Sequence, residues 1–186
     1  MKISLTLFTS LLAALSLHAQ DSEPPNPPEV QTLVADFIKA FQSGDEAAMT
    51  ACWHSPELFA KLEVAEETAA RGGTLSTEDA EKEAKREVSR REKDMSVTLK
   101  RAAKLRTLIS KHFGDTGKLE LIKLNLDLDD EAPADTPTYD SVDLHLRAAD
   151  GSHLVIELDE VMKIEGTWKF KGRLDDHLKI QLPDED

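Results

Sequence analysis

Residues 30–53 read VQTLVADFIKAFQSGDEAAMTACW, and this stretch decides the fold. Apolar side chains recur every three or four positions in its first half, so they share one side of a helix: Val30, Leu33, Val34, Phe37, Ile38 and Phe41. After Ser43-Gly44-Asp45, the side chains of Met49, Cys52 and Trp53 share a side of a second helix. Paired amphipathic helices must bury their apolar sides. We therefore expect them to pack on the strand-rich C-terminal third.

That C-terminal third begins after Gly114, where the period of apolar residues changes from helical to two. The alternating apolar positions are Ile122 to Leu128, Val142 to Ala148, Leu154 to Leu158, Met162 and Ile164, Trp168 and Phe170, and Leu178 to Leu182. Strands that are apolar on alternate residues have one packed face and one wet face. The sequence predicts an α+β fold with the N-terminal helices packed on a bent antiparallel sheet.

Two glycine-containing turns set the expected strand register. A three-residue turn at 149–151, with Gly151 last, pairs Leu144 with Ile156 and keeps apolar residues opposite apolar residues. The same pattern at 164–166 pairs Met162 with Trp168.

Two more helices are expected between the helical pair and the sheet. Ser55 and Pro56 mark the start of one that ends at Gly72. Ser76 or Thr77 caps a long charged helix over 77–113. Its second half has a full apolar side and is expected to pack, whereas its first half has a thin stripe and is expected to project.

The N-terminal segment and the net charge favour an exported protein. Residues 1–19 have the pattern of a secretory signal, 20–28 form a Pro-rich tether, and 29–186 form one α+β domain. Loss of Lys2 with the signal would change the net charge from −13 to −14. That acidity disfavours nucleic acid and anionic membranes as partners. We expect a secreted or periplasmic protein without a stable membrane anchor.

Cysteine and histidine usage points to no metal and no cofactor. Cys52 is the only cysteine, so an internal disulfide is excluded, and its place beside Trp53 favours a buried structural thiol. The histidines lack ligand spacing such as HxxxH. No phosphate loop, GxSxG or CxxC motif is present.

Two acidic residues are candidates for acid–base chemistry. In the expected register Asp140 lies opposite Glu160, Glu160 lies opposite Phe170, and both carboxylates point toward the helices. Two close acids would raise one pKa and can transfer protons. The alternative is that the sheet frays or bulges there and both acids reach water.

The candidates for lining a pocket are mostly aromatic: Trp53, His54, Tyr139, Trp168 and Phe170. Aromatic residues at such positions are more often plain core.

The pattern resembles the SnoaL-like, ketosteroid-isomerase-like superfamily, which has the nuclear transport factor 2 fold. The resemblance is carried by residues 37–41 (Phe-Ile-Lys-Ala-Phe), Gly44-Asp45, Met49, Trp53 and residues 166–170. It implies a cone of helices and bent sheet around a cavity, in a superfamily of isomerases, hydrolases and binding proteins. The helix at 77–113 departs from the pattern, as does the lack of a short strand between the early helices, and no catalytic Tyr/Asp set matches.

Three functions are compatible with the sequence. The first is a non-catalytic binding or interaction protein, with an unknown small molecule or protein as partner and a homodimer as one option. The second is a pocket enzyme that uses Asp140 and Glu160. The third is a structural protein whose charged helix docks a partner. An interior plugged by Trp53, Trp168 and Phe170 would favour the first or the third.

Overall fold

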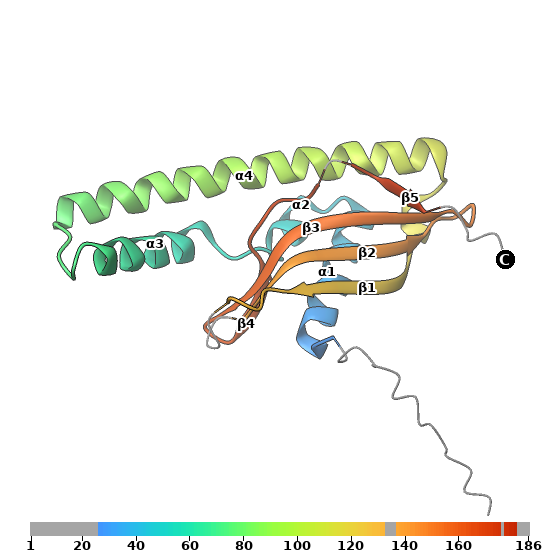
Figure 1. Ribbon diagram of the computed structural model, residues 1–186. Helices are drawn as coiled ribbons and strands as arrows, with labels where there is room; N and C mark the ends of the chain where they lie inside the picture. The colour runs from blue at the N-terminus through green and yellow to red at the C-terminus, as the bar shows by residue number, and fades with distance from the viewer. Residues whose placement is uncertain (1–25, 133–136, 176, 182–186) are drawn as a thin grey trace, which may run out of the picture.

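The computed structural model describes residues 26–132, 137–175 and 177–181, and it confirms the α+β class (Figure 1). The helices are α1 (Pro28–Ser43), α2 (Glu46–Thr50), α3 (Pro56–Ala70), α4 (Thr77–His112) and the 3-10 turn η1 (Thr116–Lys118). The strands are β1 (Glu120–Leu128), β2 (Thr138–Arg147), β3 (His153–Ile164), β4 (Thr167–Phe170) and β5 (Lys179–Gln181). The signal segment, most of the tether and Leu182 lie outside the described residues.

Polar side chains start the helices at the predicted positions. Asp45 accepts a hydrogen bond from the backbone N–H of Ala48 at 2.9 Å and so caps α2 directly. Ser55 caps α3 and Ser76 caps α4 in the same way. Gly44 ends α1 with a φ of 71°, a left-handed conformation that glycine adopts without steric cost.

The sheet is antiparallel with the order β1-β2-β3-β4, and β5 also pairs with β3. Leu144 pairs with Ile156 and Leu146 with Leu154, as the turn at 149–151 predicts. The outer face also has the predicted pairing of Asp143 with Glu157.

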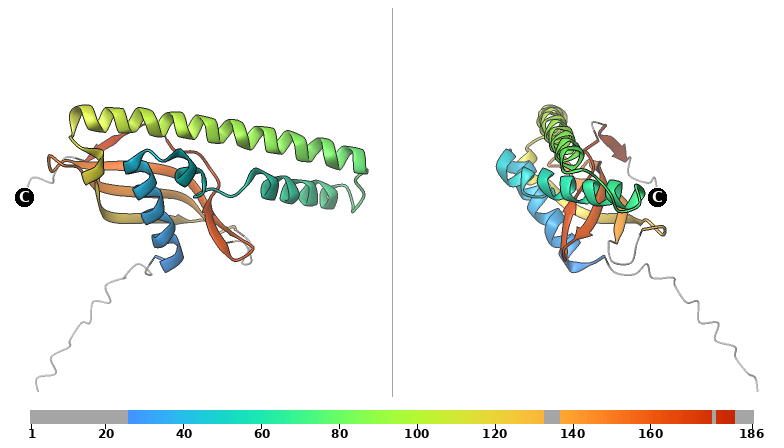
Figure 2. Two further views of the ribbon diagram at one scale, coloured as in Figure 1. Left: turned by 180° about the vertical axis from the view of Figure 1, so that it is seen from behind. Right: turned by 90° about the vertical axis from the view of Figure 1, so that its left-hand side faces the viewer.

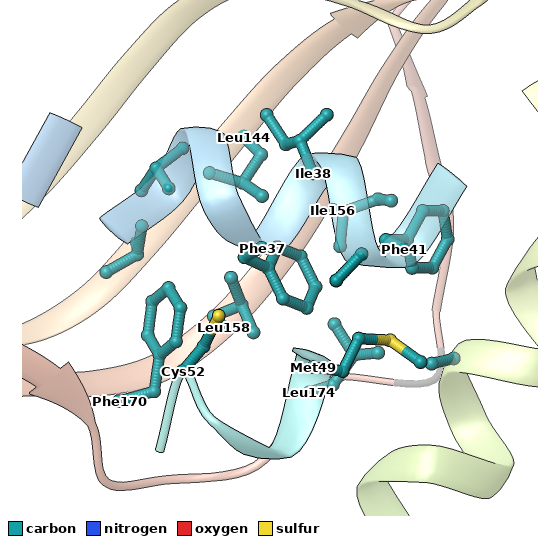
Figure 3. Packing of buried hydrophobic residues seen from close by; sticks show 14 of the residues in the cluster. Phe37, Ile38, Phe41, Met49, Cys52, Leu144, Ile156, Leu158, Phe170 and Leu174 are labelled. Carbon is teal, nitrogen blue, oxygen red and sulfur yellow. The ribbon is translucent and has the colours of Figure 1, made fainter. Parts of the chain in front are cut away.

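Helix α1 crosses one face of the sheet, and an aromatic cluster fills the space between them (Figures 2 and 3). The Phe37 ring lies 5.7 Å from the Phe170 ring and 5.8 Å from the Trp53 ring, centroid to centroid. Phe41 lies one helical turn further along α1, and it is 1% exposed. Helices and sheet therefore form one body around a filled interior, with Trp168 in the same core cluster.

Helices α3 and α4 form a hairpin that projects beyond the sheet (Figures 1 and 2). The C-terminal half of α4 packs on the body through Ala102, Leu105 and Ile109, all buried, as predicted. The N-terminal half does project, but beside α3, and Ala84 and Val88 of its thin stripe are only half-exposed. No helix in the described ranges has the length and apolar character needed to cross a membrane.

A β-bulge at Glu160 changes which residues of β3 face inward. Glu160 has a φ of 26°, and its carbonyl oxygen accepts from the backbone N–H of both Lys171 and Gly172. Two residues opposite one is the pairing of a bulge. Before Glu160 the even-numbered Leu158 is buried, and after it the odd-numbered Val161 is buried.

A shorter turn than expected changes the register between β3 and β4. Val161, rather than Glu160, pairs with Phe170, and Lys163, rather than Met162, pairs with Trp168. The turn into β4 has two residues, Glu165 and Gly166, both with positive φ. Such a turn matches the twist of the flanking strands.

Candidate functional site

A pocket of about 830 Å³ lies between α2, the start of α3 and the middle of α4. It is therefore outside the filled space between α1 and the sheet. Apolar atoms form most of its wall, and the apolar or aromatic side chains that line it are Ala47, Ala51, Trp53, Pro56, Phe59, Met95, Leu99 and Ala103. The polar lining residues include His54, Thr50, Ser55, Ser96 and Thr98.

The floor of the pocket is a short extended segment, Cys52–His54, that runs along β4. Phe170 donates its backbone N–H to the carbonyl of Cys52, and His54 donates its own to the carbonyl of Phe170. Trp53 thereby forms a parallel bridge with Phe170. Within the described residues no strand lies between the early helices, as expected, but the placing of Cys52 and Trp53 on the second helix was wrong, because α2 ends at Thr50.

His54 is buried at the floor of the pocket with one ring nitrogen already engaged. Its Nε2 lies 3.1 Å from the carbonyl oxygen of Met162, and its ring stands edge-on to Phe59 at 5.8 Å. Burial lowers the pKa of His54 below its ordinary value of 6.5, and the nearby Lys169 lowers it further, although the hydrogen bond to Met162 opposes both. The ring is therefore neutral at pH 7.

Polar contacts hold the α4 wall to the segment after β4. Arg91 donates to the carbonyl oxygen of Lys171 at 3.2 Å, and Arg101 donates to that of Leu174 at 2.8 Å. Between them, Arg173 forms an ion pair with Asp94. These three contacts fix the distance between α4 and the segment that forms the floor of the pocket.

Arg91 is itself positioned from two sides. Its guanidinium carbon lies 4.0 Å from the centre of the Phe59 ring, a cation–π arrangement. Its Nε donates to Glu87 at 2.7 Å. Glu87 is only 3% exposed; burial alone would raise its pKa, but hydrogen bonds from Arg90 and Arg91 lower it overall.

The charges around the pocket balance. Three lining residues are acidic and three are basic: Glu46, Glu92, Asp94, Arg91, Lys100 and Lys171. Arg91, Asp94 and Lys171 each have a protein partner of opposite charge. The lining therefore has no net preference for an anion or a cation.

The five predicted pocket residues fall into two groups. Trp53 and His54 line the pocket. Tyr139 and Trp168 instead contact each other, with ring centroids 5.5 Å apart, and Phe170 is fully buried in the core. The α4 residues were missed; Met95, Leu99 and Ala103 recur at four-residue steps, which is the signal that could have found them.

The two candidate acids lie at the sheet end, and neither lines this pocket or a second cavity of about 410 Å³ beside α1 and α2. Asp140 is exposed, and Glu160 is paired with Lys171 at 2.9 Å. The expectation that both point toward the helices was wrong, because the bulge turns Glu160 away from the core. Partial desolvation, with help from Asp129 and Glu160, raises the pKa of Asp140.

Within the residues that the structure describes, no group of three or more His, Cys, Asp or Glu side chains is arranged to hold a metal ion.

Comparisons with known proteins identify no family for this chain. No protein-family model matches the sequence, and no curated protein matches it either. A structure search finds a cystatin-like protein from Ruminococcus gnavus ATCC 29149, with a TM-score of 0.41 and 16% sequence identity. The similarity covers 99% of this chain but only 48% of that protein, so this chain spans about half of its length. The α+β assignment comes from the arrangement of the chain's own helices and open antiparallel sheet.

Proposed function

We propose that this protein is an exported, non-catalytic binding protein that holds a small apolar molecule between α2 and α4. The observation that supports this proposal is the pocket of about 830 Å³ with largely apolar walls. Small-molecule sites typically enclose about 300–1,000 Å³ and carry few polar groups. The interior of the cone, by contrast, is filled by Phe37, Trp53 and Phe170.

Hydrogen bonds between protein groups hold the walls of the pocket in place. Arg91 and Arg101 fix α4 to the segment after β4, and the N–H of Trp53 fixes the floor to Gly172. Because these bonds join protein groups to each other, a ligand need not order the walls, and preorganisation favours affinity.

The proposal is tested by native mass spectrometry of protein purified from its own host, followed by uptake of the fluorescent probe N-phenyl-1-naphthylamine, which is uncharged at neutral pH. We expect a retained small molecule or micromolar uptake of the probe. Ala103→Trp would fill the pocket from α4, and Ala65→Trp places the same side chain on an exposed site of α3 outside it. Binding should be lost in the first variant and kept in the second. A wild-type protein that retains nothing and takes up no probe would refute the proposal.

Export is part of the same proposal, supported by the signal pattern of residues 1–19. The mature protein from a secreted or periplasmic fraction should begin near Gln20 by intact mass. Membership of the SnoaL-like superfamily, without its active site, is also proposed, on the motifs of α1, α2 and the β3–β4 hairpin. Homodimerisation remains a prediction.

A further inference from the structure

We infer that the pocket selects neutral apolar molecules that carry a hydrogen-bond donor, and that Nδ1 of His54 accepts this hydrogen bond. The inference rests on the proposed function, because it names the ligand class of the same pocket.

The hydrogen bond to Met162 decides the tautomer of His54. A backbone carbonyl oxygen can only accept, so Nε2, which lies 3.1 Å from it, must carry the proton. In a neutral imidazole the other nitrogen is then an acceptor. His54 therefore presents an acceptor at Nδ1 and no second donor.

That acceptor is unused within the protein. Nδ1 of His54 makes no hydrogen bond to any residue that the structure describes. The residue is only 8% exposed, but its Nδ1 atom is still accessible to solvent. An acceptor on a largely buried side chain has little room for hydrating water, and this one has no donor among the described residues. A ligand group that donates to it supplies the missing hydrogen bond.

A second polar group lines the same pocket. Thr98 is 2% exposed, and its hydroxyl makes no hydrogen bond within the described part of the chain. A hydroxyl both donates and accepts, so Thr98 offers a second polar contact within the same pocket. An alcohol or a phenol can donate to Nδ1 of His54, whereas a hydrocarbon cannot.

The charge of the lining favours a neutral ligand over a carboxylate or an amine. The acidic and basic lining residues are equal in number, and the three that lie nearest the bulge and Phe59 are already paired: Arg91, Asp94 and Lys171. A carboxylate would also present only acceptors to Nδ1 of His54. Specificity for a donor is strong where a buried acceptor would otherwise stay unpaired.

The test uses two matched probes, 2-naphthol and 2-methoxynaphthalene, which differ in the hydrogen-bond donor. Their dissociation constants are measured by equilibrium dialysis at pH 7.5 against the full chain. We expect 2-naphthol to bind about 3–10-fold more tightly, the range of one net hydrogen bond. His54→Phe should abolish that preference. His54→Gln should keep it, because its amide can donate to Met162 and still offer an acceptor.

Each outcome is decisive. Equal affinities in the wild-type protein would overturn the inferred ligand class and leave the proposed binding function standing. A preference that survives in His54→Phe would overturn the role of His54. If neither naphthalene binds, the inference fails, and the proposed function fails with it only if the protein also retains no small molecule and takes up no fluorescent probe. If His54→Phe does not fold, the wild-type comparison together with His54→Gln still decides, and Ala103→Trp should block both probes.

Discussion

The indole N–H of Trp53 donates a hydrogen bond to the carbonyl oxygen of Gly172 at 2.8 Å, across 119 residues of sequence. This bond joins the floor of the pocket to the segment that follows the β3 bulge. The same segment carries the Lys171 and Leu174 carbonyls that receive Arg91 and Arg101 of α4. The bulge is therefore the point at which sheet, pocket floor and pocket wall meet.

Gly172 should be the least replaceable glycine in this region. A Cβ atom added there would lie 2.3 Å from the Cβ of Asp159 and 2.9 Å from its backbone carbon, so the bulge would have to open. We expect Gly172→Ala to destabilise the protein by about 1–3 kcal/mol in urea unfolding, the range of overpacked sites. The pocket probe should bind more weakly in the same variant.

Gly117→Ala is the matched control for that measurement. Its added carbon would meet only the carboxylate oxygen of Asp115, at 3.2 Å, in an exposed turn. A Gly172→Ala variant as stable as Gly117→Ala would show that the bulge does not require the close approach.

Glu87 should contribute more to stability than an ordinary surface carboxylate. It is buried at 3% exposure and accepts hydrogen bonds from Arg90 and Arg91 at 2.7–2.8 Å. Glu87→Gln should cost about 1–3 kcal/mol of unfolding free energy at pH 7, the usual range for a hydrogen bond to a charged group. Glu81→Gln on the exposed side of α4 should cost almost nothing.

The pH dependence of that difference follows from the pKa of Glu87. Hydrogen bonds from the two arginines outweigh burial and lower the pKa below its usual 4.5. The stabilisation is present above 4.5 and is lost as the pH falls through the lower, folded value. The wild-type and Glu87→Gln curves should therefore converge in strong acid, and a constant gap down to pH 2 would contradict the assignment.

Most of the fold follows from local patterns in the sequence, and the errors lie at one end of the sheet. The helix caps at Ser55 and Ser76 and the pairing of Leu144 with Ile156 are as predicted. The turn into β4 has two residues rather than three, so the pairing of β3 with β4 differs from the prediction by one position. The left-handed backbone of Glu160 exchanges the two faces of β3 at that point, which explains the inward Val161 and the outward Glu160.

The pocket was less accessible to sequence reasoning than the fold. Trp53 and His54 are candidates because they follow the second helix, but the opposite wall comes from α4, more than 35 residues away in sequence. Its apolar positions from Met95 to Ala103 read equally well as core. Only the contacts of Arg91 and Arg101 with the segment after β4 decide which side of α4 faces the pocket.

The carboxylates Asp140 and Glu160 provide a test of the catalytic alternative. Neither lines the pocket, and the contact of Glu160 with the lining is its ion pair with Lys171. The double variant Asp140→Asn with Glu160→Gln should therefore change the affinity for the fluorescent probe by no more than an exposed ion pair is worth, less than about fivefold. The measurement is a fluorescence titration with the probe that tests the proposed function. A large loss of binding, or of any activity found in the wild-type protein, would favour the enzyme instead.

His54 should make the protein lose stability on mild acidification. Burial is the largest cause of its lowered pKa, Lys169 adds to it, and the Met162 hydrogen bond and Glu165 oppose it. The unfolded chain therefore takes up a proton near pH 6.5 while the folded chain does not, so the unfolded state binds more protons below that pH. The His54 contribution to the unfolding free energy is complete above pH 6.5 and falls as the pH drops below it, by at most about 1.4 kcal/mol per pH unit.

Urea unfolding at pH 7.5 and 5.5 should show a larger drop in unfolding free energy for the wild-type protein than for His54→Gln. The other histidines still titrate in both proteins, so their effect cancels in the comparison. Equal drops would mean that burial does not lower the pKa of His54 in the folded protein.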